Sequence, residues 1–89
     1  MIKLEVQEMH IRLVIALNEW DPFKLGFGQY ETEIADVVQA VHTSDNEEKL
    51  ATKIQDIYEF SFEEIIPNDE CRKIANQLLQ IKHAGSCSL

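Results

Sequence analysis

Apolar residues recur every three or four positions through most of the chain, which is the spacing of one face of an α-helix. The pattern predicts four helices: residues 2–18, residues 31–43, a third that opens near Ser44, and a last one that Gly85 stops. Alternation typical of a strand occurs only at residues 2–6, and a lone strand has no partner. We therefore expect an all-α fold, a small bundle of about four helices.

Each predicted helix has one continuous apolar face, which we expect to form the core. The four faces consist of Ile2, Val6, Met9, Leu13, Ala16 and Leu17; Tyr30, Ile34, Val37, Val38 and Val41; Leu50, Ala51, Ile54, Ile57 and Tyr58; and Cys71, Ile74, Ala75, Leu78 and Ile81. The first helix carries a second stripe, Leu4, Ile11 and Ile15, roughly opposite to the first. Either this helix is covered on both sides within the bundle, or the stripe contacts a partner or a second subunit, as in a homodimer.

Two short patterns predict where helices begin. Ser44 followed by Glu47, and Ser61 followed by Glu64, both fit the capping box, in which the hydroxyl and the carboxylate satisfy free backbone N–H groups. We therefore expect the third helix to begin at Ser44. We also expect the chain to bend at Ser61 and to form a short turn that Pro67 ends.

Length and charge narrow the class of protein. The 89 residues suit a single helical domain, residues 1–85, with a short tail at 86–89. Sixteen acids against eight Lys and Arg give a formal charge of −8, which repels nucleic-acid phosphates. No apolar run approaches the ~20 residues that cross a bilayer, and Glu5, Glu8, His10 and Arg12 interrupt any signal-peptide pattern. These features indicate a cytoplasmic protein that binds neither nucleic acid nor membrane.

Residues that could carry chemistry are scattered. His10, His42 and His83 lie on three different predicted helices, none three or four positions from another histidine. Cys71 belongs to a core face, and Cys87 lies in the tail, where nothing would hold a base beside it. No glycine-rich phosphate loop is present. The sequence predicts no metal, no cofactor and no catalytic residue, so we expect a protein that is not an enzyme.

The stretch EWDPFKLGFGQYETE, residues 19–33, is unusual because it concentrates aromatic residues, glycines and a proline. Asp21 before Pro22 predicts an N-cap and one helical turn, after which Gly26 to Gly28 reverse the chain. We expect an ordered corner whose apolar side chains plug the open end of the bundle. These side chains are Trp20, Phe23, Leu25, Phe27 and Tyr30; the alternative is an aromatic patch exposed for a partner.

Two functions fit these patterns. The first is a small interaction or regulatory protein that binds another protein, a basic one if the acids carry the encounter. The residues expected to bind this partner are Trp20, Asp21, Phe23, Tyr30, Glu31, Glu33, Glu59 and Glu63. The second is a small-ligand binder or enzyme with an aromatic pocket, lined by Trp20, Phe23, Tyr30 and Tyr58.

The segments NEWDPF, YETEIADVVQAVH and IYEFSFEEIIP and the tail SCSL resemble the YugE-like family of small proteins from Bacillus-type bacteria, a domain of unknown function. The resemblance covers nearly the whole chain. It implies a compact helical domain in a bacterial cytosol, and it implies no activity and no catalytic residue. The WDP motif followed by an aromatic and acidic helix is also similar to small acidic immunity proteins, which neutralise toxins.

Overall fold

The computed structural model describes the backbone of residues 2–87 and the side chains of residues 8–83. It contains four helices: α1 (Ile2–Trp20), α2 (Glu31–Thr43), α3 (Glu47–Phe62) and α4 (Asn68–Cys87), with no strand between residues 2 and 87. This confirms the predicted all-α bundle. In the same part of the chain, no helix combines the length and the apolar character needed to cross a membrane.

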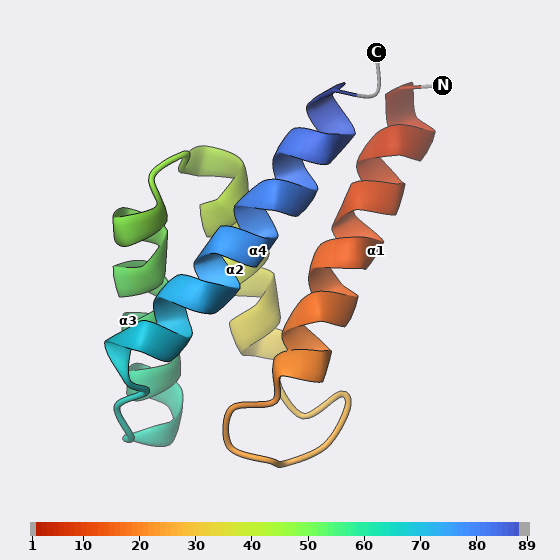
Figure 1. Cartoon of the computed structure of the whole chain (residues 1–89). Helices are drawn as coiled ribbons and strands as arrows, with labels where there is room; N and C mark the ends of the chain where they lie inside the picture. Colours follow the sequence, from red (N-terminus) through yellow and green to blue (C-terminus); the bar gives the residue numbers. More distant parts are fainter. Residues whose placement is uncertain (1, 88–89) are drawn as a thin grey trace.

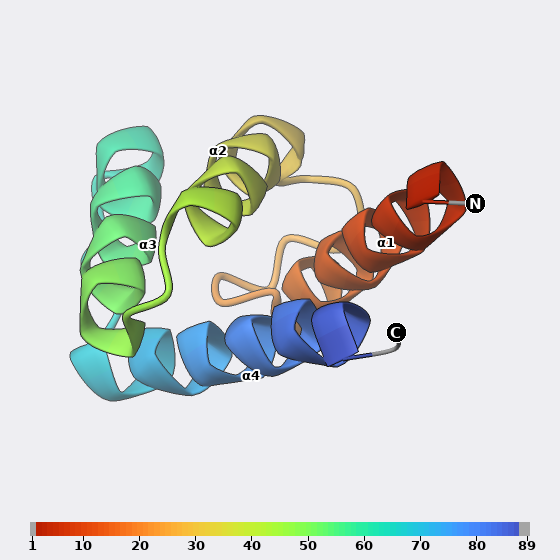
Figure 2. The same cartoon turned by 90° about the horizontal axis from the view of Figure 1, so that it is seen from above.

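Helix α4 packs against each of the other three helices, most extensively against α3 and then against α1. Helices α1 and α3 lie at opposite edges, and α2 packs between them (Figures 1 and 2). The first turn of α1 and the last turn of α4 lie at one end. The α1–α2 loop and the α3–α4 loop lie together at the other end, which we call the loop end (Figure 1).

The core follows the predicted apolar faces. Its fully buried side chains include Leu13 and Leu17 of α1, Val37 of α2, Ile54 of α3 and Leu78 of α4. The predicted core members that are only half-buried are Met9, Ile57 and Ile81, and they pack against the edge of this cluster. The side chains of Ile2 and Val6 lie outside the described residues.

The second stripe of α1 is not covered by the bundle. Ile11 is 55% exposed and Ile15 is 41% exposed, while the side chain of Leu4 lies outside the described residues. Of the two alternatives for this stripe, the one in which the bundle covers α1 on both sides is therefore wrong, because α1 lies at an edge of the bundle and not in its middle (Figure 2).

The start of α3 differs from the prediction. Asn46, not Ser44, is the N-cap, and its side-chain oxygen accepts a hydrogen bond from the backbone N–H of Lys49 at 2.9 Å. Ser44 instead follows the last residue of α2 and donates its N–H to the carbonyl of Val41. The Lys82 ammonium donates to the carbonyl oxygens of Val41 and Ser44, which fixes this linker against α4 and leaves Asn46 to begin the helix.

Asn46→Ala is expected to lower the free energy of unfolding by about 1 kcal/mol, because one N–H in the first turn of α3 loses its acceptor. Ser44→Ala should cost clearly less, since the Ser44 hydroxyl caps no helix. Urea unfolding of both variants measures the difference. A larger loss for Ser44→Ala would mean that α3 begins where the sequence pattern suggested.

Two further boundaries differ from the prediction. Helix α3 continues through Ser61 to Phe62 with no bend, so the second capping-box prediction is wrong, and Glu63 ends the helix in the left-handed region at φ 57°. Helix α4 continues past Gly85 to Cys87. A glycine inside a helix costs only about 1 kcal/mol relative to alanine, which is too little by itself to end a 20-residue helix.

Candidate protein-binding surface

The Asp21 carboxylate organises the loop between α1 and α2. It accepts hydrogen bonds from the backbone N–H of Leu25 at 2.8 Å and of Gly26 at 3.1 Å, and from the Tyr30 hydroxyl at 2.5 Å. The hydrogen bond from Tyr30, helped by the backbone donors, lowers the pKa of Asp21 below its ordinary 3.8. The predicted helical turn is absent: Asp21 has φ 38°, and Lys24 closes a single β-turn onto the Asp21 carbonyl.

Asn18 and Tyr30 complete the support of this loop. The Asn18 side chain is buried, accepts from the N–H of Gly28 at 2.9 Å and donates to the carbonyl of Val14 at 3.1 Å. The Tyr30 hydroxyl also accepts from the N–H of Phe23. The role of Asn18 was not predicted from the sequence. The available signal was that Asn18, a polar residue, directly follows Leu17 of the predicted core face.

Aromatic rings fill the loop end below the core. Tyr58 lies 5.3 Å from Trp20 and 5.7 Å from Tyr30, and Phe62 lies 4.9 Å from Phe23, as distances between ring centroids. Tyr30 and Tyr58 are completely buried, while Trp20 and Phe23 are half-buried. These four rings pack on one another, as expected of a plug at the open end of the bundle, and the complete burial of Tyr30 and Tyr58 leaves only Trp20 and Phe23 at the surface.

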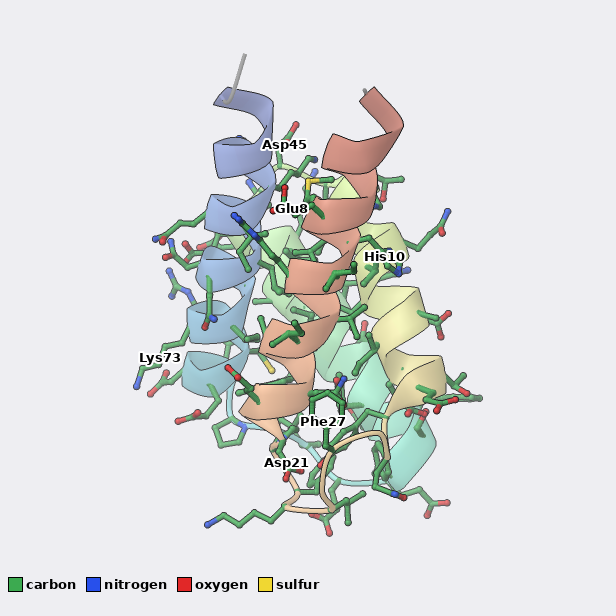
Figure 3. The ribbon with its side chains drawn as sticks, turned by 90° about the vertical axis from the view of Figure 1, so that its right-hand side faces the viewer. Glu8, His10, Asp21, Phe27, Asp45 and Lys73 are labelled. Carbon is green, nitrogen blue, oxygen red and sulfur yellow. The ribbon has the colours of Figure 1, made fainter. Side chains whose placement is uncertain are left out.

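Leu25 and Phe27 do not belong to the plug, contrary to the prediction. Phe27 is 71% exposed and Leu25 is 48% exposed. Leu25 and Phe27 belong to the part of the loop whose backbone is bound by Asp21 and Asn18, and their exposure places both side chains outside the plug. Figure 3 shows Asp21 and Phe27 on this loop, at the loop end of the molecule.

A surface cleft of about 390 Å³ separates the two loops, and we call it the loop cleft. Its walls are Trp20, Asp21, Pro22, Phe23 and Lys24 on one side and Glu64, Ile65, Ile66, Pro67 and Glu70 on the other. Of the predicted partner-binding residues, Trp20, Asp21 and Phe23 line this cleft. Tyr30 supports it from beneath and has no exposed surface of its own.

A shallow depression lies at the end of α3, and we call its residues, Asp56, Glu59, Phe60, Glu63 and Ile65, the Phe60 patch. Phe60 is 90% exposed and Ile65 is 67% exposed, and Ile65 also lines the loop cleft. The predicted residues Glu59 and Glu63 belong to this patch. None of its three acids takes part in an ion pair among the side chains of residues 8–83.

The other two predicted acids lie elsewhere. Glu33 is only 8% exposed, so the expectation that it lies on the acidic surface is wrong: it faces the interior of the bundle. Burial chiefly, and the charge of Glu33 in addition, raise the pKa of Tyr58. Glu31 is exposed but lines a separate groove between α1 and α2. The structure therefore brings five of the eight predicted residues to the loop end surface.

Backbone strain is concentrated at this end. Asp21, Lys24 and Glu63 all have φ between 38° and 58°, and they are the non-glycine residues with positive φ in the described part of the chain. Such residues persist only where their surroundings enforce them, and they are frequent at functional sites. Both loops that border the loop cleft carry this strain.

Glu63→Gly is expected to stabilise the fold by about 1 kcal/mol, because glycine adopts the left-handed conformation without the Cβ penalty. Glu64→Gly is the matched control: Glu64 is also exposed and has no positive φ, so its replacement should give no gain. Chemical denaturation of the two variants measures the difference. Equal stabilities would show that Glu63 carries no strain.

The described residues offer little for covalent or metal chemistry. No group of three or more His, Cys, Asp or Glu within them lies close enough together to hold a metal ion. Cys71 is fully buried, and burial raises the pKa of its thiol to about 11, so the thiol stays protonated at neutral pH. His10, His42 and His83 are exposed on α1, α2 and α4. The most distinctive surface remains the loop end.

Comparison with known proteins gives a consistent family assignment. The chain is 45% identical over 85 residues to the "Uncharacterized protein YugE" of Bacillus subtilis (strain 168), which covers 93% of this chain and 99% of that protein. Its fold matches the crystal structure of APC36109 from Bacillus stearothermophilus with a TM-score of 0.86 and 44% identity, over 88% of this chain and 96% of that one. The model of the family described as "Domain of unknown function (DUF1871)" matches residues 12–88. The predicted YugE-like resemblance is thus confirmed, and the chain belongs to the DUF1871 family.

Proposed function

We propose that this protein is a non-catalytic binding module that docks a basic partner protein on the Phe60 patch and the adjoining loop cleft. The observation that carries the proposal is the combination, at one end of the molecule, of large exposed apolar side chains and acids that form no ion pair with the side chains of residues 8–83. Phe60 and Ile65 are largely exposed, and Asp56, Glu59 and Glu63 surround them.

Burial of the apolar side chains of the patch would favour binding of a partner. Burying a phenylalanine or isoleucine side chain is worth about 1.5–3 kcal/mol relative to leaving it in water. The side chains of Phe60 and Ile65 stay exposed, so folding does not gain this energy from them, although most other large apolar side chains are buried. A partner that covers both side chains would recover this energy, and the loop cleft beside Ile65 could receive one of the partner's own apolar side chains.

The acidic part of the patch selects the partner's charge. Exposed acids act over about a Debye length, ~10 Å at 0.1 M salt, and mainly raise the rate at which a basic partner associates. The side chains of Asp56 and Glu59 lie on α3 without an ion-pair partner among the described residues. Their charges are therefore free to attract lysine and arginine side chains of another protein.

Association kinetics test this proposal. Proteins captured from a Bacillus lysate would be purified, and their binding to the wild type would be measured by surface plasmon resonance at low and high salt. The double variant Asp56→Lys/Glu59→Lys should slow association by at least about tenfold at low salt. Phe60→Ser should instead speed dissociation, because it removes an apolar contact and leaves the charges unchanged.

The matched control is Asp36→Lys/Glu48→Lys, which changes the net charge by the same amount at exposed positions on α2 and in the first turn of α3. It should slow association much less than Asp56→Lys/Glu59→Lys, because its charges lie away from the patch and the loop cleft. The Phe60 patch would be ruled out as the docking site if the association rate did not change with salt concentration. It would also be ruled out if both double variants slowed association equally.

A further inference from the structure

The outer face of α1 forms a second apolar surface that the bundle leaves open. Ile11 and Ile15 are exposed and lie one helical turn apart. Val14 is half-buried beside them and borders a groove that continues to Ala35 and Val38 of α2. Figure 2 shows α1 at the edge of the bundle, with no other helix on its outer side.

One acid and one base border this face. Glu8 and Arg12 are both exposed, and their side chains form an ion pair of 3.4 Å within α1. Figure 3 shows Glu8 on the side of α1 nearer to α4, whereas His10 points to the side of α2. Ile11 lies between these two borders by helical register, since at 100° per residue it is 60° from Glu8 and 100° from His10 around the helix axis.

The positions of these residues are self-complementary about a two-fold axis. If two copies of α1 pack antiparallel with the axis level with residue 10, Glu8 of each copy lies beside Arg12 of the other. Ile11 then lies within about 3 Å of its own copy along the helix axis, at 1.5 Å rise per residue. The backbone position of Leu4, seven positions before Ile11, falls one residue, about 1.5 Å along the helix, from the level of Ile15 of the second copy. A parallel pairing would instead place Glu8 against Glu8.

We infer that the occupant of this face is a second copy of the same chain, bound through antiparallel pairing of α1. A two-fold interface must be complementary to itself, and the Glu8 and Arg12 positions satisfy that condition together with the central Ile11. Self-association through the acidic patch at the loop end would bring like charges together. The dimer uses a different face from the partner-binding proposal, so either can fail without the other.

Sedimentation equilibrium over a range of protein concentrations tests this inference. The wild type should reach twice the chain mass of 10.3 kDa. Ile11→Asp should give a monomer with the same helical circular dichroism, because the side chain is already exposed. Thr52→Asp, an exposed position on α3 at the far edge of the bundle, should leave the dimer intact. A wild type that is still monomeric at about 1 mM would overturn the inference.

Charge exchange tests the register of the two helices. Glu8→Arg and Arg12→Glu should each weaken the dimer, because each places like charges opposite one another across the axis. The double variant Glu8→Arg/Arg12→Glu should restore it. Loss of the dimer in the double variant, or no effect of either single change, would overturn the antiparallel arrangement.

Cross-linking gives an independent measure of the same register. In a Cys87→Ser background, Ile11→Cys should form a disulfide-linked dimer on mild oxidation. Ile15→Cys should not, because its two copies are separated by ~15 Å along the helices, beyond the reach of a disulfide. Cys71 is buried and does not compete. Cross-linking at position 15 but not at position 11 would contradict the proposed axis.

Discussion

Tyr58→Ala is expected to lower the free energy of unfolding by about 3–5 kcal/mol, the range for removing a large aromatic side chain from a core. The Tyr58 ring is completely buried and occupies the centre of the aromatic cluster at the loop end, in contact with Trp20, Tyr30 and Phe62. Its neighbours are held by α1, the α1–α2 loop and α3 itself, so they cannot easily collapse into the space left behind. For a domain of 89 residues this loss approaches the whole stability.

Tyr58→Phe separates the role of the ring from that of the hydroxyl. The Tyr58 hydroxyl is buried and has no hydrogen-bond partner among the described residues, and an unsatisfied buried polar group costs about 1–3 kcal/mol. Phenylalanine keeps the ring and removes this cost, so the variant should be at least as stable as the wild type. Guanidinium unfolding followed by Trp20 fluorescence measures both variants. A clear loss in Tyr58→Phe would show that the hydroxyl has a partner.

Helical periodicity was sufficient to predict the core because each face repeats over several turns. A single misplaced residue does not change such a pattern, so Leu13, Leu50 and Leu78 are all buried as expected. The same periodicity shows that Ile11 and Ile15 share a stripe. It cannot tell whether that stripe is covered, because the position of α1 within the bundle depends on how α4 packs against it.

Helix ends were harder to predict, because several residues in one short segment can each act as a cap. The sequence S-D-N offers three capping residues in a row, and the contacts of Lys82 with the carbonyls of Val41 and Ser44 decide in favour of Asn46. Those contacts join residues nearly forty positions apart. The end of α3 at Glu63 was equally hard to predict. No local sequence pattern predicts a glutamate in the left-handed backbone conformation, because glycine is the usual residue at that position.

The candidate surface could be predicted only in part. Trp20 and Phe23 were expected at the loop end, since a tryptophan and phenylalanine around W-D-P mark an ordered corner. Phe60 was missed, although it falls off the stripe that Leu50, Ile54 and Tyr58 define and could have been recognised as exposed. Glu33 could not have been recognised as buried, because helical spacing places it away from the apolar face of α2.

Tyr30→Phe is expected to destabilise the fold by about 2 kcal/mol at neutral pH, although it removes only one oxygen atom. The Tyr30 hydroxyl donates to the charged Asp21 carboxylate and accepts from the N–H of Phe23, and hydrogen bonds to charged groups are worth about 1.5–3 kcal/mol. We take the lower part of this range because Asp21 is half-exposed. The loss would also loosen one wall of the loop cleft.

The pH dependence identifies Asp21 as the partner. Because the folded pKa of Asp21 is lowered below its ordinary 3.8, the ionised carboxylate stabilises the fold at any pH above that value, and this contribution is lost as the pH falls through the folded pKa. The difference in stability between the wild type and Tyr30→Phe should therefore be constant from neutral pH down to about pH 4 and shrink below it.

Asp21→Asn is the control for this pair, because it keeps the shape of the side chain and removes the charge. It should lower the melting temperature at neutral pH and abolish most of the additional effect of Tyr30→Phe, since the two groups act through one hydrogen bond. Thermal unfolding of the wild type, the two single variants and the double variant at pH 7 and pH 3 gives the complete double-mutant cycle. If the two losses simply add at pH 7, Tyr30 and Asp21 stabilise the loop independently, and the loop cleft is not held by the bond between them.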